Sequence, residues 1–310
     1  MDLTTSDLVE IGMDAATSDA PSPPRNLEAR ILGAARAKGR PPMHPGWAGG
    51  TDDLTTHAAF ITTTADLYAL LHSLTDDAWT RRTGVADRVS VRELVLHLVG
   101  VERYMLGQLG RREPLHAPTP ADHFPVLRSA AADLESSETA HITRGWWQAA
   151  LDLIGATAEL GPDHPIAYHD LVGSVQGMLI IRTFELWTHD DDIRRAVGRP
   201  ANLLDGARLG LMSSTLLGVL PYAMARAGTT QPGRTVRIDL TGPGGGTSFV
   251  TALSPDEQPG SPDLVIETSA LDLCRVASNR LPIDALEVAV EGDRSLLEPV
   301  LVGAGAFAMD

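Results

Sequence analysis

The stretch that most constrains this chain is 180–192, which reads Ile-Ile-Arg-Thr-Phe-Glu-Leu-Trp-Thr-His-Asp-Asp-Asp. Glu185 and His189 stand four residues apart in it, and residues with this spacing share one face of a helix. The surrounding residues are apolar almost all round, which is typical of a central helix. A carboxylate inside such a helix is costly unless it is paired or bound to a metal. The pair is therefore a candidate for two ligands of one metal ion.

A second helix supplies a candidate third ligand, His97. Residues 90–93, Ser-Val-Arg-Glu, form a predicted capping box that starts a strong amphipathic helix over 91–109. His97 lies beside the apolar stripe of this helix, so we expect it to be mostly buried. Two histidines and one glutamate with an open fourth position are the ligand pattern of catalytic zinc sites. Asp192, one turn beyond the second histidine, is a candidate for orienting an imidazole.

Simpler interpretations of the same residues remain open at this point. A glutamate and a histidine four apart are often a surface pair, and a histidine beside an apolar stripe is more often a core residue. The acidic run 190–192 fits a solvated face as well. His116 and His123, in a proline-rich loop, are more typical of solvated residues than of ligands. Three candidate ligands on buried helices strengthen the case for a metal without deciding the matter.

Composition excludes several classes of protein. The chain has 310 residues, 43% of them hydrophobic, and a net charge of −15, which argues against a nucleic-acid partner. Its single cysteine, Cys274, excludes an internal disulfide framework, and its only lysine, Lys38, lies in a polar segment unsuited to Schiff-base chemistry. We find neither a signal peptide nor a membrane-spanning stretch. These features predict a cytoplasmic protein. Apart from composition, we expect a small-molecule substrate and a monomer or homodimer.

The apolar periodicity predicts a helical bundle followed by a small α+β domain. Residues 1–52 are expected to form an extension with one short helix over 26–38, residues 53–228 the bundle, and residues 229–310 the α+β domain. The glycine-rich run 242–246 is expected to be a hairpin turn rather than a phosphate loop, because no helix follows it. The expected bundle helices are 53–74, 91–109, 124–136, 146–160, a helix from Leu171 or Ser174 to about 197, and 203–226. In the last domain we expect strands 235–241, 248–253, 264–268 and 286–290, a helix over 270–280, and a final helix after 293.

Two motifs resemble the mycothiol-dependent maleylpyruvate isomerase family. They are 90–102, SVRELVLHLVGVE, and 182–200, RTFELWTHDDDIRRAVGRP. This family belongs to the DinB-like bundle group, and the resemblance covers roughly 55–225. Segments 235–242 and 273–280 resemble the sterol-carrier-like domain that follows the bundle in the same family. The resemblance implies a DinB-like up-down bundle, a sterol-carrier-like domain, and a divalent metal, usually zinc, bound by a ligand set of three: His97, Glu185 and His189.

The resemblance also implies a reaction. In such enzymes mycothiol, a low-molecular-weight thiol, reaches the open metal position, where a thiol is deprotonated. A thiolate is the active nucleophile, and it adds to an electrophilic substrate for isomerisation or thiol transfer. Arg275 and Arg280 are the candidates for holding a substrate carboxylate through a bidentate fork. Either arginine is equally well read as a solvated helix residue.

Two other functions fit the same sequence. The first is a metal enzyme of this fold that uses no thiol, such as a hydrolase or a tailoring enzyme of secondary metabolism that activates water at the open position. The second is a non-catalytic binding or sensor protein whose sterol-carrier-like domain holds an apolar ligand. The N-terminal extension departs from the two-domain pattern and leaves room for both.

Overall fold

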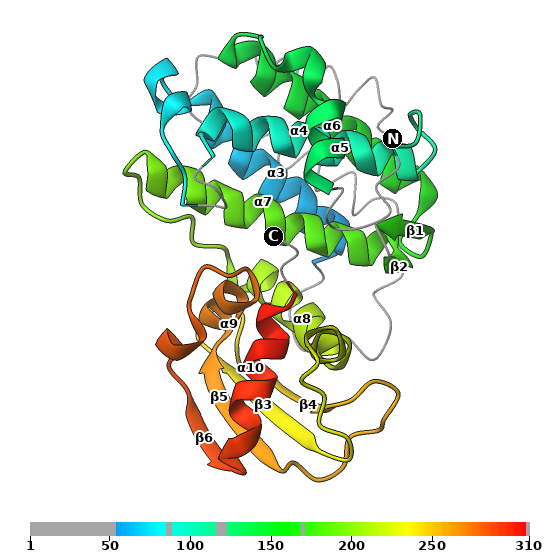
Figure 1. Cartoon of the computed structure of the whole chain (residues 1–310), viewed down its shortest axis with the longest axis vertical. Helices are drawn as coiled ribbons and strands as arrows, with labels where there is room; N and C mark the ends of the chain where they lie inside the picture. Colours follow the sequence, from blue (N-terminus) through cyan, green and yellow to red (C-terminus); the bar gives the residue numbers. More distant parts are fainter. Residues whose placement is uncertain (1–53, 85–88, 116–122, 169–170, 308–310) are drawn as a thin grey trace. The chain divides into compact units, whose positions relative to one another are not determined.

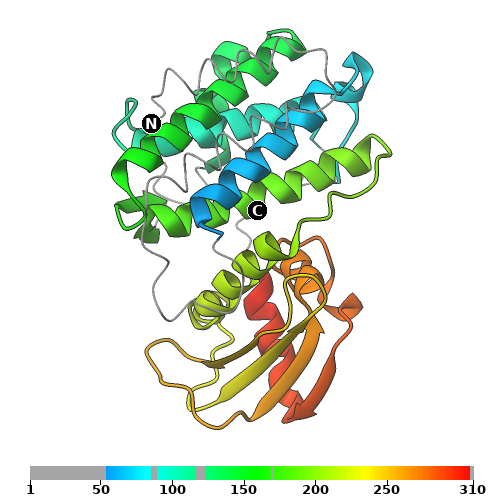
Figure 2. The same ribbon diagram turned by 180° about the vertical axis from the view of Figure 1, so that it is seen from behind.

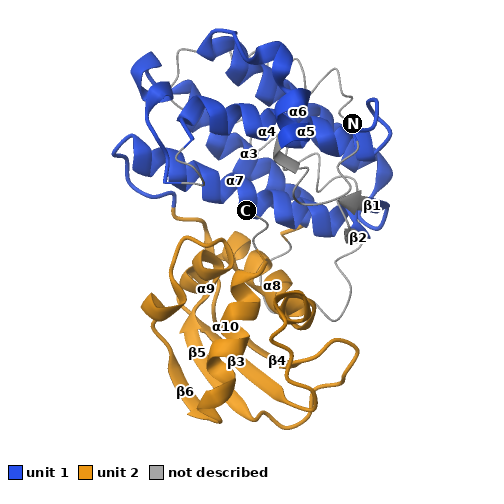
Figure 3. Ribbon diagram, in the orientation of Figure 1, with its two compact units in different colours: residues 1–41, 56–202 blue, residues 42–55, 203–310 orange. Residues whose placement is uncertain are grey.

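The structure is a computed structural model that describes residues 54–84, 89–115, 123–168 and 171–307. The described chain divides into two compact units, one formed by residues 56–202 and the other by residues 54–55 and 203–307 (Figure 3). The predicted extension over 1–52, with its helix at 26–38 and Lys38, lies outside the described residues. The expected architecture, a helical bundle followed by a small α+β domain, is confirmed.

Four long helices build the first unit (Figures 1 and 2). Helices α3 and α4 each contact both α6 and α7, so the four helices enclose a common core. The long helices are α3 (Thr56–His72), α4 (Val91–Gln108), α6 (Thr139–Leu160) and α7 (Val175–Ala196). Shorter pieces are α5 (His123–Ala130) and the 3₁₀ turns η2 (Asp76–Thr80) and η5 (Ala132–Leu134). Helix α6 begins before the predicted residue 146.

The predicted capping box sets the start of α4. The Ser90 side chain accepts a hydrogen bond from the Glu93 amide at 3.2 Å, and the Ser90 amide donates to Glu93 Oε2 at 2.7 Å. Two amides that the first turn leaves without helical partners are thereby satisfied. The register of α4, and hence the position of His97, follows from this start.

A short hairpin, which was not predicted, precedes α7. Strands β1 (Pro165–Tyr168) and β2 (Leu171–Ser174) pair antiparallel, so of the two predicted helix starts the one at Leu171 is wrong and the one at Ser174 agrees with the structure. Helix α7 starts only after Ser174, whose side chain accepts from the Gly177 amide at 3.4 Å. Serine is a preferred helix N-cap because its oxygen satisfies such an amide.

The second unit is a four-stranded mixed sheet with helices packed against it. The strand order is β4-β3-β5-β6, with β3 and β5 parallel and the outer pairs antiparallel. Helices α9 and α10 lie on one face of the sheet, in front in Figure 1 and behind in Figure 2. The elements are α8 (Gly206–Ala227), β3 (Thr235–Thr241), β4 (Ser248–Ala252), β5 (Leu264–Ser269), α9 (Ala270–Ala277), η6 (Ile283–Ala285), β6 (Ala289–Gly292), η7 (Arg294–Leu296) and α10 (Leu297–Gly305).

Two boundaries differ from expectation. Contacts group α8 with the sheet unit, because it packs on α10, α9 and β4. The division between the units therefore falls after Asn202 instead of the predicted residue 228. The last strand lies at 289–292, later than the predicted 286–290, because a 3₁₀ turn occupies 283–285.

The glycine-rich run is a hairpin turn, as predicted. It joins β3 to β4, which pair antiparallel, and it packs against the start of α8. A Cβ on Gly244 would lie 2.7 Å from the Gly210 amide nitrogen, closer than real Cβ contacts allow. Gly244 also has φ +77°, a conformation that favours glycine. The run is therefore explained by a close approach of backbones. Within the described residues, none of the helices has both the length and the apolar character needed to cross a membrane.

Candidate metal centre

Helix α7 is buried along most of its length, including its acidic end. Asp190, Asp191 and Asp192 are 1%, 8% and 2% exposed, so the alternative of a solvated acidic face is wrong. Arg194 Nε donates to Asp190 at 2.5 Å, and Arg195 Nη2 donates to Asp191 at 3.4 Å. Burial still raises the pKa of Asp190 to about 6, because Arg194 offsets the desolvation only in part.

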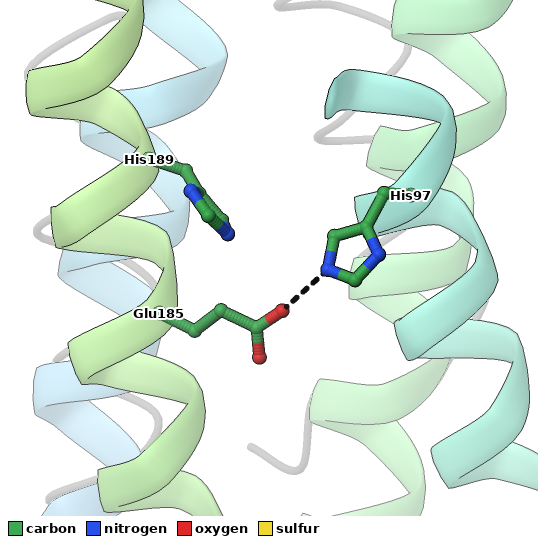
Figure 4. Close-up of side chains that lie close together, drawn as sticks. All are labelled: His97, Glu185 and His189. Carbon is green, nitrogen blue, oxygen red and sulfur yellow. Dashed lines mark hydrogen bonds and ion pairs between the residues drawn. The ribbon is translucent and has the colours of Figure 1, made fainter. Parts of the chain in front are cut away.

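His97, Glu185 and His189 come together as the sequence predicted. His97 points from α4 toward Glu185 and His189 on α7 (Figure 4). One ligand atom from each side chain lies within 4.8 Å of the others, and His97 Nε2 lies 3.1 Å from Glu185 Oε1. The two imidazole rings are 5.8 Å apart and perpendicular. The side chains of His97 and Glu185 keep 16% and 18% exposure, so the cluster is open to solvent on one side.

The donor set fits a zinc-like ion. Two imidazole nitrogens and one carboxylate oxygen match the ligands of catalytic zinc sites with an open fourth position. Ligand atoms about 2.0–2.1 Å from a tetrahedral ion lie about 3.4 Å from one another. The separation between His97 and Glu185, 3.1 Å, is close to this spacing, and the 4.8 Å limit leaves His189 within reach. A cation between these side chains would replace the proton that their hydrogen bond now requires.

Asp192 fixes the orientation of His189. Asp192 Oδ2 lies 3.1 Å from His189 Nδ1, and both side chains are almost fully buried. A proton on Nδ1 that is donated to the carboxylate leaves Nε2 as the nitrogen available to a metal. A carboxylate behind a ligating histidine is the usual device for fixing its tautomer and ring position. The predicted contact is present.

A buried ion pair that the sequence interpretation missed lies behind Glu185. Arg182 Nη1 donates to Glu185 Oε2, and Arg182 Nη2 donates to Glu102 Oε1 at 2.8 Å. The Arg182 and Glu102 side chains are both 0% exposed. The available signal was an arginine on an otherwise apolar helix, one turn before a candidate ligand. No spacing rule links it to Glu102 on another helix.

This pair controls the charge state of Glu185. Burial opposes ionisation of Glu185, yet Arg182 and then His97 outweigh it and lower the pKa of this carboxyl well below its usual range. For Glu102 burial dominates and raises the pKa, with Arg182 offsetting only part of it. Glu185 is therefore the carboxylate that stays ionised, as a metal ligand must be.

The charges around the cluster leave room for a divalent cation. Glu102, Glu185 and Asp192 are three buried or nearly buried carboxyl groups, and Arg182 is the cation between two of them. Buried charge of one sign is costly. A divalent ion held by the two histidines and Glu185 would offset the negative charge of the carboxyl groups that are ionised.

Arg275 and Arg280, the predicted carboxylate-binding arginines, lie in the second unit. Arg275 is half-buried on α9 and donates to Asp272 at 3.2 Å. Arg280 follows that helix, and its Nη1 donates to the Ser278 carbonyl at 2.8 Å. Cys274, the residue before Arg275, is 0% exposed, as expected of a small core residue. His116 lies outside the described residues, and His123 is the first residue of α5.

Comparison with known proteins supports the family resemblance. Residues 60–194 match the family model described as mycothiol maleylpyruvate isomerase N-terminal domain. Two solved structures are similar: the mycothiol-dependent maleylpyruvate isomerase, with TM-score 0.51, and a mutant of that enzyme, with TM-score 0.52. Each is 14% identical, and the match covers 76% of this chain and 91% of the other. At that identity the likeness shows a shared fold. No curated protein matches this sequence.

Proposed function

With the helical unit matched to the mycothiol maleylpyruvate isomerase N-terminal domain, we propose that this protein is a divalent-metal enzyme that uses mycothiol. Zinc is the metal that we expect, and the thiol serves as cofactor or co-substrate. The reaction is isomerisation or thiol transfer on a small electrophilic substrate. We propose that the protein acts in the cytoplasm, where a low-molecular-weight thiol stays reduced.

The observation that carries this proposal is the convergence of His97, Glu185 and His189 between α4 and α7. The three side chains come from two helices, leave one side exposed, and lie within the segment that matches the family model. A structural zinc site would use four protein ligands and be closed. An open three-ligand site instead supports a role in catalysis.

The residues of the chain have distinct roles in this proposal. His97 and His189 offer neutral nitrogens, and Asp192 holds the His189 ring in place. Glu185 offers one ionised oxygen. Bound zinc would lower the pKa of a thiol at the open position and so supply the thiolate nucleophile. The part of the cluster that keeps some exposure, at His97 and Glu185, is where thiol and substrate would enter.

Arg275 and Arg280 are proposed to hold a carboxylate of the substrate. Guanidinium groups bind carboxylates through paired hydrogen bonds, and lysine cannot reproduce this fork. We expect Arg275→Lys or Arg280→Lys to raise KM for a carboxylate substrate while leaving metal content unchanged. An unchanged KM in both variants would remove the arginines from the proposal.

Metal analysis of the purified protein tests the ligand set. Wild type should carry one zinc per chain after exposure to Zn²⁺ and dialysis, whereas His97→Ala, Glu185→Ala and His189→Ala should each lose most of it. His141→Ala is the matched control, since His141 is an exposed histidine of the same bundle. A wild type without stoichiometric zinc, or three variants that all retain it, contradicts the ligand assignment.

Calorimetric titration of the zinc-loaded protein with mycothiol tests the thiol. Saturable binding that disappears in His189→Ala supports the proposal, and turnover of maleylpyruvate then tests the substrate of the named relative. Zinc binding without mycothiol binding at millimolar concentration would point to a thiol-independent metal enzyme. Absence of both would leave the non-catalytic binding function.

A further inference from the structure

The Glu185 carboxylate is held from both sides. Its Oε1 faces His97 Nε2 at 3.1 Å, and its Oε2 accepts from Arg182. Arg182 stands one helical turn before Glu185, so the guanidinium and the carboxylate share one face of α7. A carboxylate held in this way has one oxygen left for a metal. Rotation about its terminal bond is blocked by the arginine.

Arg182 is itself fixed by Glu102. The Arg182 Nη2–Glu102 Oε1 hydrogen bond is 2.8 Å long, and both side chains are 0% exposed. The two guanidinium nitrogens therefore each bind a different carboxylate. Arginine suits this arrangement because its planar fork presents donors in fixed directions, whereas lysine carries a point charge.

The pair also joins the two helices that carry the ligands. Glu102 and His97 both belong to α4, while Arg182 and Glu185 both belong to α7. The contact between Glu102 and Arg182 thus ties α4 to α7, five residues after His97 on α4 and three residues before Glu185 on α7. Any shift between the helices changes both contacts together.

We propose that Glu102 and Arg182 are positioning residues that hold Glu185 as a ligand with a single available oxygen and fix its distance from His97. This inference rests on the proposed metal site. A merely structural ion pair would stabilise the bundle without setting metal affinity. A positioning pair would set both the affinity and the geometry at the metal.

The experiment compares Glu102→Gln and Arg182→Lys with a matched control, Asp133→Asn. Asp133 accepts from Arg103, the residue after Glu102 on α4, and this pair joins α4 to the segment after α5. Zinc affinity is measured by competition with a chromogenic chelator. Cobalt-loaded protein then gives a visible spectrum that reports the ligand geometry. Circular dichroism checks the fold of every variant.

Loss of a group that orients a metal ligand typically lowers affinity about 10–100-fold. We expect a loss in this range for Glu102→Gln and Arg182→Lys, together with a shifted cobalt spectrum, and an affinity within about twofold of wild type for Asp133→Asn. Folded Glu102→Gln with wild-type affinity and spectrum overturns the inference. If Glu102→Gln does not fold, Glu102→Asp, which keeps the charge but is one carbon shorter, is judged by the same criteria. Wild type that binds neither Zn²⁺ nor Co²⁺ would instead overturn the proposed function, and this inference with it.

Discussion

The two units of this protein treat buried charge in opposite ways. In the bundle, Glu102, Arg182 and Asp192 are at most 2% exposed and lie around one cluster. Among the described residues of the sheet unit, Arg208 is the charged side chain that is buried, and its partner Asp205 is exposed to solvent. The remaining interior there is apolar or neutral, as around Cys274. An interior that serves packing alone avoids charged residues, because the desolvation penalty of a buried ion pair often exceeds the attraction between its charges.

The comparison identifies which buried polar groups need a functional explanation. In the sheet unit burial raises the pKa of Cys274, so its thiol stays protonated and inert. In the bundle Arg182 holds Glu185 ionised against the same burial. Burial thus keeps the Cys274 thiol protonated, whereas at Glu185 the neighbouring Arg182 outweighs burial and keeps the carboxyl ionised. Four predictions test this contrast.

The largest effect is expected for Arg182→Leu in metal-free protein. The change leaves Glu102 and Glu185 without their shared cation, and breaking a buried ion pair from one side costs about 3–5 kcal/mol. Urea unfolding followed by circular dichroism measures this loss. Combining Arg182→Leu with Glu102→Leu should recover most of it, since apolar residues can replace a buried pair. If Arg182→Leu alone lowers the free energy of unfolding by less than about 1 kcal/mol, the buried pair matters no more than a surface pair, which contradicts the contrast between the two units.

A smaller loss is expected for Cys274→Ser. This places a hydroxyl in an apolar interior, which costs about 1–3 kcal/mol when the group finds no partner. Cys274→Ala, which removes the sulfur without adding a polar group, is the control and should lose less. In wild type the thiol should resist a chromogenic thiol reagent until urea unfolds the sheet unit. Rapid labelling of native protein would show that the thiol is accessible.

Helix caps should behave alike in both units. Ser90→Ala removes the α4 cap and Asp205→Ala removes the α8 cap, whose side chain accepts from the Arg208 amide at 2.9 Å. Each change should lower the free energy of unfolding by about 1 kcal/mol, the usual value for a lost N-cap. Thermal unfolding measures both. A clearly larger loss at Ser90 than at Asp205 would contradict the expectation that the two caps are equivalent.

The smallest effect is the pH dependence of the Asp205 cap. Burial raises the pKa of Asp205, but the Arg208 amide and guanidinium outweigh it and lower the pKa below its ordinary value. A lowered pKa stabilises the fold above the unfolded pKa, and this contribution is lost as pH falls through the folded value. Relative to Asp205→Asn, wild type should lose a few tenths of a kcal/mol in acid, because Asp205 is exposed to solvent, which screens its interaction with the buried Arg208. Urea unfolding at neutral and acidic pH measures this difference. An equal change in unfolding free energy with pH for the two proteins would contradict the prediction.

Only part of the ligand cluster was predictable from local spacing. Glu185 and His189 are four residues apart and so share a helical face, whereas His97 lies on another helix and was joined to them by the family resemblance. The hairpin at 165–174 was missed because its strands are only four residues long and run directly into a helix. The link between Glu102 and Arg182 was missed because it depends on how two helices pack, which periodicity does not report.

The polar groups of α7 form one line along the helix: Arg182, Glu185, His189 and Asp192, spaced by three, four and three residues. An α-helix turns about 100° with each residue. Inserting or deleting one residue between Arg182 and Asp192 would leave the helix intact. It would, however, rotate the side chains on one side of the change away from those on the other, so that they no longer all face His97. The proposed metal centre should tolerate insertions or deletions in the loops before and after α7, but not within α7 itself. The proposed metal centre therefore depends on the unbroken helical spacing of the eleven residues 182–192.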